Sequence, residues 1–202
     1  MKIAIIGATG NVGTRLTDEA LRRGHTVTAL ARQASKLPTR DGVVAKDIDV
    51  SNAQVLADAL RGSDVVISTV RFLQATTSQI TDAVKAAGVK RLLVVGGAGS
   101  LYIAPGKQLV DTPEFPDAYK AEASAGRDFL NALKKETSLE WTFLSPSALF
   151  TPGERTGKFR LGKEDLLATA DGSSISMEDY AMAMLDEIEQ PEHVRERFTV
   201  GY

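Results

Sequence analysis

The sequence predicts an α/β protein built on a doubly wound, mainly parallel sheet. Short apolar runs rich in β-branched residues alternate with helical stretches along the first half of the chain. The helical stretches stop at glycines, and a glycine-rich turn follows the first apolar run directly. This alternation is typical of strands joined by crossover helices, and the 202 residues suit one compact unit.

The first half contains five apolar runs that we expect to be strands: residues 3–6, 26–30, 43–45, 65–68 and 92–95. The runs are nearly unbroken, as is typical of parallel strands buried on both faces. The intervening helices end at Gly24, Gly62 and Gly88, since glycine readily takes the left-handed conformation there. Ser51 and Gln54 have the spacing of a capping box, which predicts a helix from about residue 52.

The second half has a looser pattern. Three prolines between residues 105 and 116 predict a long surface loop. We then expect, in order, a helix over residues 118–135, a strand over 141–144 ended by Pro146, a second loop over 151–163, a helix over 175–190 and a last short strand over 198–200. The carboxylate pairs at 178–179 and 186–187 would then lie on a solvated helix face.

Composition excludes several classes of function. With 24 basic and 26 acidic side chains the formal net charge is −2, so no broad basic field is available for nucleic acid. The chain has no cysteine, and its two histidines, His25 and His193, lie too far apart in sequence to suggest a metal cluster. No signal peptide and no long apolar run are present, so we expect a cytoplasmic protein that does not bind membrane. The near-neutral charge predicts no nucleic-acid partner, and we expect a monomer or homodimer.

The turn over residues 7–13 is the strongest binding motif. Gly7, Gly10 and Gly13 have the spacing G-x-x-G-x-x-G, directly after the first strand and at the start of the first helix. Residues without a Cβ let a pyrophosphate approach the helix N-terminal amides closely. The alternative is a strand-to-helix turn that binds nothing, but the surrounding pattern favours a dinucleotide.

This spacing resembles the extended and atypical branches of the short-chain dehydrogenase/reductase superfamily. The segments that narrow the resemblance are residues 30–32, 36–38, 46–48, 65–68, 92–97, 141–146 and 153–158. Together they are similar to the NmrA-like group that includes the biliverdin-IXβ and flavin reductases. The resemblance implies a single Rossmann-type NAD(P)-binding domain over residues 1–202, in which residues from about 145 to 202 form a small carboxyl-terminal substrate lobe.

The second strand ends at Arg32 and not at the carboxylate of an NAD-preferring site. A guanidinium there can clamp a 2′-phosphate, with Lys36 adding charge, so we expect NADP with NAD as the alternative cofactor. The resemblance implies that Asp47 accepts from the adenine amino group and that Ile48 packs on the ring. The expected cofactor-binding set is Gly7, Thr9, Gly10, Asn11, Val12, Arg32, Lys36, Asp47, Ile48, Ser68, Thr69, Val70, Gly96, Gly97, Ser145 and Pro146.

The catalytic pattern departs from the classical superfamily, whose members use a Tyr-x-x-x-Lys pair. Four residues after Tyr119 this chain has Ala123. Hydride transfer to a flat acceptor such as a free flavin or a quinone needs no such acid, because the acceptor delocalises the charge. We therefore expect a reductase in which FMN or FAD is a substrate and not a prosthetic group. Ser100 is the catalytic candidate, and an ordinary turn serine is the alternative.

Two other functions fit the same residues: an NmrA-like regulator that senses dinucleotide without turnover, and a sugar epimerase or dehydratase with an unrecognised acid. The loop over residues 151–163 carries Arg155, Lys158, Arg160 and Lys163 between glycines. These cations suggest a mobile flap that draws in the phosphate of FMN, and a solvated loop is the alternative.

Overall fold

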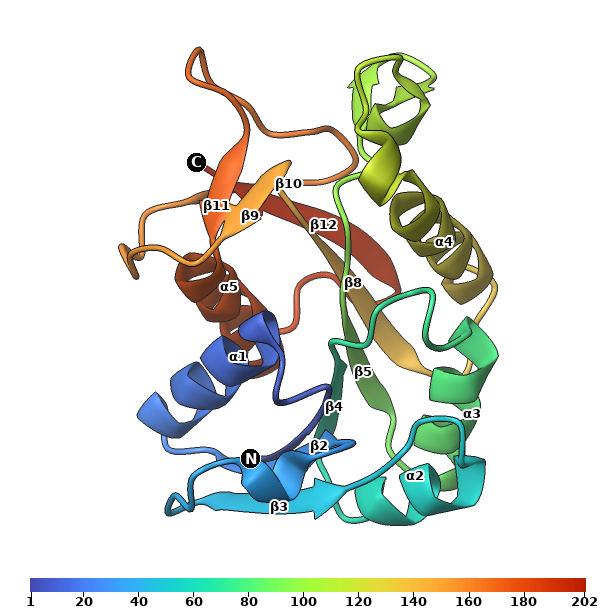
Figure 1. The fold of residues 1–202 in the computed structure, drawn as a ribbon, viewed down its shortest axis with the longest axis vertical. Coiled ribbons are helices and arrows are strands. Elements are labelled where there is room, and N and C mark those ends of the chain that lie inside the picture. Colours follow the sequence, from blue (N-terminus) through green and yellow to red (C-terminus); the bar gives the residue numbers. More distant parts are fainter.

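The computed structural model describes residues 1–202 and contains one eight-stranded sheet (Figure 1). In sheet order the strands are β10 (Arg160–Gly162), β12 (Glu196–Gly201), β8 (Glu140–Pro146), β5 (Arg91–Val95), β4 (Val65–Ser68), β1 (Lys2–Ile6), β2 (Thr26–Ala31) and β3 (Val43–Asp47). Every neighbouring pair is parallel except β10 with β12. The direction of winding reverses between β1 and β4, which is where ligands bind in such sheets.

Helices cover both faces of the sheet (Figure 1). One layer contains α1 (Asn11–Arg22) and α5 (Met177–Glu189), and the other contains α2 (Ala53–Leu60), α3 (Thr77–Ala86) and α4 (Asp117–Leu133). Alternate residues of β1 supply the two cores: Ile3 and Ile5 pack in the α1 and α5 layer, and Ala4 and Ile6 pack in the other. The structure thus confirms the doubly wound α/β fold.

The strands of the first half lie where they were expected, but β3 is not buried on both faces. Four of its five residues are exposed, and Val44 retains 57% exposure. The prediction of a buried strand is wrong because β3 is the outermost strand of the sheet, with β2 as its sole neighbour. An apolar run of this length does not distinguish an edge strand from a central one.

The start of α2 differs in its cap. Asn52 is the N-cap, and its side-chain oxygen accepts from the Val55 backbone N–H at 3.2 Å. The backbone N–H of Ser51 instead donates to Asp49, so the capping box expected from Ser51 is wrong. A capping box is present at α3, where Thr76 and Gln79 satisfy each other's backbone donors.

The second half is more regular than expected. The proline-containing loop holds the hairpin of β6 (Tyr102–Ala104) and β7 (Lys107–Gln108), with Gly106 at positive φ in its turn. The second loop ends in β10, and the expected helix over 175–190 begins as β11 (Ser174–Ser176), which pairs with β9 (Leu149–Thr151). Pro146 is the last residue of β8 and lies opposite Val200, so the strand includes this proline.

Two carboxylates of α5 are buried, so the expectation of a solvated face is wrong for them. Asp179 is fully buried and accepts from the Thr156 hydroxyl at 2.5 Å and the Gly157 N–H at 2.8 Å. Glu187 is 4% exposed and pairs with Arg91 at 2.8 Å. The direct partners of both carboxylates compensate for the cost of burying their charge.

No helix in the protein has the length and apolar character needed to cross a membrane.

Candidate functional site

The turn between β1 and α1 uses its glycines in different ways. Gly7 has φ +87°, and a Cβ added there would lie 2.3 Å from Thr69 Oγ1. A Cβ on Gly13 would lie 2.4 Å from the carbonyl oxygen of Gly7. The turn itself therefore requires these two glycines, for backbone conformation and for the contact between strand and helix.

Gly10 has no such role. Its φ of −75° suits any residue, and a Cβ there would meet nothing closer than the Gly7 carbonyl oxygen at 3.4 Å. Gly10 precedes α1, which has no side-chain cap and no acidic residue in its first turn. The missing side chain leaves space in front of free helix amides, which fits a pyrophosphate.

A cavity of about 780 Å³ opens beside this turn, at the carboxyl ends of β1, β2 and β4. The expected cofactor residues that line it are Gly7, Thr9, Gly10, Arg32, Ile48, Thr69 and Val70. Sequence reasoning missed other lining residues, among them Gln33, Asp49, Arg71 and Gln74. Each of these follows the end of a strand, which is the signal that could have identified them.

Arg32 lines this cavity and is exposed, and no hydrogen bond or ion pair holds its guanidinium. Asp49 lines the same cavity. The backbone N–H of Ser51, with Arg32 as a further contributor, holds the pKa of Asp49 below its ordinary value. Lys36 does not line the cavity, and its ammonium donates to the Gln33 side chain at 3.0 Å.

Several expected cofactor residues lie outside the cavity lining. Asp47 accepts from the backbone N–H and the hydroxyl of Ser35, both at 2.7 Å, so its carboxylate holds a local turn. Ile48 lines the cavity and Asp47 does not, so one of the two expected adenine contacts lies at the cavity.

The remaining expected cofactor residues lie near the cavity without lining it. Asn11 and Val12 begin α1 beside the cavity. Ser68, Ser145 and Pro146 also lie outside the lining, at the carboxyl ends of β4 and β8. The hydroxyl of Ser145 is buried without a partner.

A second cavity, of about 600 Å³, lies between the loop after β5 and the start of α4. Gly96 and Gly97 both line it, but they differ. A Cβ on Gly96 would lie 2.4 Å from the Phe143 ring, whereas a Cβ on Gly97 would meet only Phe72, at 3.9 Å. Gly97 therefore leaves open space at the wall of this cavity. Its lining comes mainly from residues 96–127, with Ala148, Leu149 and Ser173 from the carboxyl-terminal segment.

The loop between β4 and α3 separates the two cavities. Arg71 lines the first and Phe72 lines the second. Glu122 of α4 fixes this loop, because its carboxylate accepts from the backbone N–H groups of Phe72 at 2.7 Å and Leu73 at 3.2 Å. The two cavities therefore adjoin on either side of this loop.

Ser100 lies at the edge of the second cavity and is 3% exposed. Its hydroxyl accepts from the guanidinium of Arg197 at 3.0 Å, and its carbonyl accepts from the same side chain. This arrangement favours the turn-serine alternative, and a catalytic role for Ser100 stays a prediction. Tyr119 also lines the cavity and is 66% exposed.

The loop over residues 151–163 does not form a flap over the second cavity. Arg155 donates to both oxygens of Glu19 on α1, at 2.7 and 2.9 Å. Arg160 donates to the carbonyl oxygens of Ala168 and Tyr202. The segment lies beside α5 (Figure 1), so the flap prediction is wrong for Arg155 and Arg160, which have partners from other parts of the chain.

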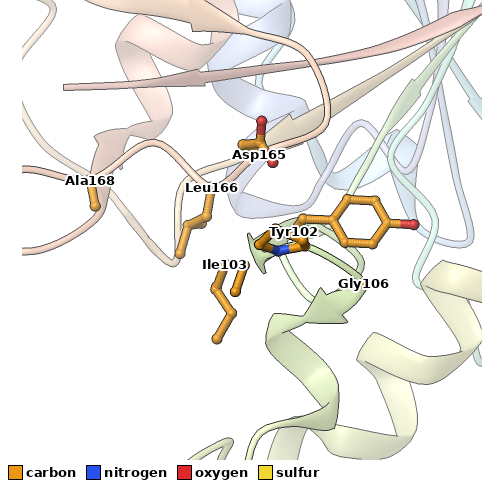
Figure 2. A pocket seen from close by; sticks show the side chains of 8 residues that line it. Tyr102, Ile103, Gly106, Asp165, Leu166 and Ala168 are labelled. Atoms are coloured by element: carbon orange, nitrogen blue, oxygen red, sulfur yellow. The ribbon is translucent and has the colours of Figure 1, made fainter.

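A third cavity, of about 680 Å³, lies between the β6–β7 hairpin and residues 165–168. Figure 2 shows that the ring of Tyr102 points away from Ile103 and Leu166. None of the expected site residues lines this cavity. The two adjoining cavities, which most of the expected site residues line, are therefore the candidate functional site.

Comparisons with known proteins identify the family and the relatives of this chain. The model of the NAD(P)H-binding family matches residues 7–191. A solved structure from Burkholderia pseudomallei, described as a candidate exported protein, is 49% identical, with a TM-score of 0.89 and full coverage of both chains. A candidate epimerase from Bacteroides thetaiotaomicron is 46% identical, with a TM-score of 0.94 over 100% of this chain and 96% of that one. A candidate NADH-flavin reductase from Streptococcus pneumoniae is 35% identical, with a TM-score of 0.83 over 100% and 99%.

Proposed function

This chain belongs to the NAD(P)H-binding family, and we propose that within it the protein is an NADPH-dependent reductase of free flavins, quinones or similar flat acceptors. The observation that supports the proposal is the position of two cavities on either side of one loop, the first beside the glycine turn over residues 7–13 and the second with open space at Gly97. The flavin-reductase name given to the relative from Streptococcus pneumoniae supports it.

The first cavity supplies the binding groups for the cofactor. The free amides at the start of α1 would receive the pyrophosphate in front of Gly10, and Arg32 would clamp the 2′-phosphate. Bound NADPH would be the source of the hydride, and the acceptor would be reduced by that hydride and one proton from water, with NADP⁺ as the other product. Ile48 and Val70 would pack against apolar parts of the cofactor.

The second cavity would orient the acceptor. Phe72 and Phe115 give it apolar walls, and Gly97 lets a ring approach the backbone after β5. Holding two rings in contact supplies most of the rate enhancement in such a transfer. Tyr119 is largely exposed and has no lysine four residues on, so the proposal assigns it no proton transfer.

The test is anaerobic oxidation of NADPH by the purified protein with riboflavin, FMN or menadione, with NADH compared in parallel. We expect many turnovers with at least one acceptor, followed by loss of reduced-nicotinamide absorbance. If NADPH binds by calorimetry but none of these acceptors is reduced, the result contradicts the proposed reductase, and a protein that also converts no sugar substrate fits a dinucleotide sensor. Conversion of a sugar nucleotide without net loss of NADPH would indicate an epimerase, as the name of the Bacteroides relative suggests.

A further inference from the structure

We propose that the second cavity selects flat acceptors without an anionic group, so that the protein reduces riboflavin or an uncharged quinone in preference to FMN. This inference rests on the proposed reductase function and names its substrate class. It follows from the charged side chains around the cavity, because the one cation that lines it, Arg127, already has a carboxylate partner.

Three charged side chains line the cavity: Glu114, Glu122 and Arg127. Arg127 is the sole cation among them, and its Nη1 donates to both carboxylate oxygens of Asp111, at 2.9 and 3.0 Å. Glu122 is held by two backbone amides and lies 3.8 Å from the Arg71 guanidinium. Glu114 is exposed, and no hydrogen bond or ion pair within the protein holds its carboxylate.

The amino end of α4 also lies at this cavity, where Pro116 and Tyr119 are lining residues. A helix amino end by itself attracts anions. Here Asp117 occupies the first turn and Glu114 precedes it, so carboxylates already offset the helix dipole. Lys120 follows on the same helix, but it is exposed and does not line the cavity.

The cations of the loop over residues 151–163 are not placed to bind the phosphate of FMN in this cavity. Arg155 is bound to Glu19, and Arg160 is bound to backbone carbonyls. Lys158 and Lys163 do not line the cavity. A phosphate that entered would therefore face carboxylates with no free cation, and like charges in contact repel one another. An uncharged ring meets instead the apolar surfaces of Phe72, Leu109 and Phe115.

Riboflavin and FMN are the matched probes, because they share one ring system and differ in the phosphate. With saturating NADPH and low salt, we expect kcat/KM to be at least about threefold higher for riboflavin. Added salt screens charge, so it should raise kcat/KM for FMN and leave riboflavin unchanged. Equal or faster reduction of FMN at low salt, or a fall in FMN reduction with salt, would overturn the inference.

The variant Glu114→Gln removes the unpaired carboxylate. We expect it to raise kcat/KM for FMN about threefold relative to kcat/KM for riboflavin. Asp128→Asn is the matched control: it removes a charge from an exposed residue of α4 that does not line the cavity, so both flavins should behave as with the wild type. If both variants help FMN equally, the effect is one of overall charge and the cavity does not select.

Failure of the inference can be told apart from failure of the proposed function. Oxidation of NADPH by both flavins without discrimination would leave the reductase proposal intact and contradict the selection. If none of the acceptors oxidises NADPH, the proposed reductase function is contradicted. In that case, quenching of flavin fluorescence in the presence of NADP⁺ still tests the cavity, and tighter binding of FMN than of riboflavin would contradict the selection as well.

Discussion

Two glycine-containing regions near strand ends differ in what their arginines contact. One is the turn over residues 7–13 with the nearby Arg32, and the other is the loop over residues 151–163 with Arg155. Both follow the carboxyl end of a parallel strand, and both combine glycines with a nearby arginine. Arg32 has no partner within the protein and lines a cavity. Arg155 is bound at both oxygens of a carboxylate that is 3% exposed.

The difference shows that residue type and position at a strand end do not identify a ligand-binding arginine. Glu19, the partner of Arg155, lies 136 residues away in sequence, on a helix that packs in the same layer as α5. Asp179 holds the same loop through Gly157. A cation with such partners stabilises the fold, and one without them is available to a phosphate.

The largest expected effect is that of Gly10→Val. A branched side chain would fill the space in front of the α1 amides, so dinucleotide binding should weaken at least about a hundredfold. Calorimetry measures the loss, and thermal unfolding should show a stable protein because the φ of Gly10 suits valine.

Gly13→Val is the contrasting variant for the same turn. Its Cβ would clash with the Gly7 carbonyl oxygen at 2.4 Å, so it should destabilise the protein itself. Wild-type affinity in a folded Gly10→Val variant would show that the cofactor does not occupy this turn.

In the loop over residues 151–163, removing the partner of Arg155 should lower the stability of the protein and leave cofactor binding unchanged. Glu19→Gln removes the carboxylate shared by Arg23 and Arg155, and we expect it to lower the free energy of unfolding by about 1–3 kcal/mol. Denaturant unfolding measures this change, and NADPH affinity should stay within about twofold of the wild type. A large loss of NADPH affinity with an unchanged free energy of unfolding would show that Glu19 belongs to the cofactor site, and the two regions would then not differ in the way described.

The same ion pairs predict a pH dependence. The hydrogen bond from Arg155, opposed by burial and aided by Arg23, lowers the pKa of Glu19 below its ordinary value of 4.5. The contribution to stability is therefore complete above about pH 4.5 and is lost as the pH falls through the lowered pKa. The difference in unfolding free energy between wild type and Glu19→Gln should shrink below that pH, and a constant difference would contradict the assignment.

The smallest expected effect is that of replacing Arg155 and Lys158 together by alanine. Arg155 is bound to Glu19, and Lys158 does not line the second cavity. We therefore expect the ratio of kcat/KM for FMN to kcat/KM for riboflavin to change by less than about twofold. A selective loss of FMN reduction would restore the flap interpretation of this loop.

Local patterns were enough to predict the fold and the position of the glycine turn between β1 and α1. The apolar runs, the terminal glycines and the turn over residues 7–13 each depend on neighbours in sequence. The edge exposure of β3, the burial of Asp179 and the engagement of Arg155 depend on which distant elements pack together. The clamp by Glu122 on the loop after β4 likewise joins residues about 50 positions apart, and no spacing in the sequence indicates it.

The comparison of Arg32→Ala with Arg155→Ala, by calorimetric titration with NADPH and with NADH, tests the central claim most directly. The loss of a charge-assisted contact to a 2′-phosphate is worth about tenfold to a hundredfold in affinity. We therefore expect Arg32→Ala to weaken NADPH by that factor and leave NADH unchanged, while Arg155→Ala changes neither. Equal weakening of both cofactors by Arg32→Ala, or a loss of NADPH binding in Arg155→Ala, would contradict the account.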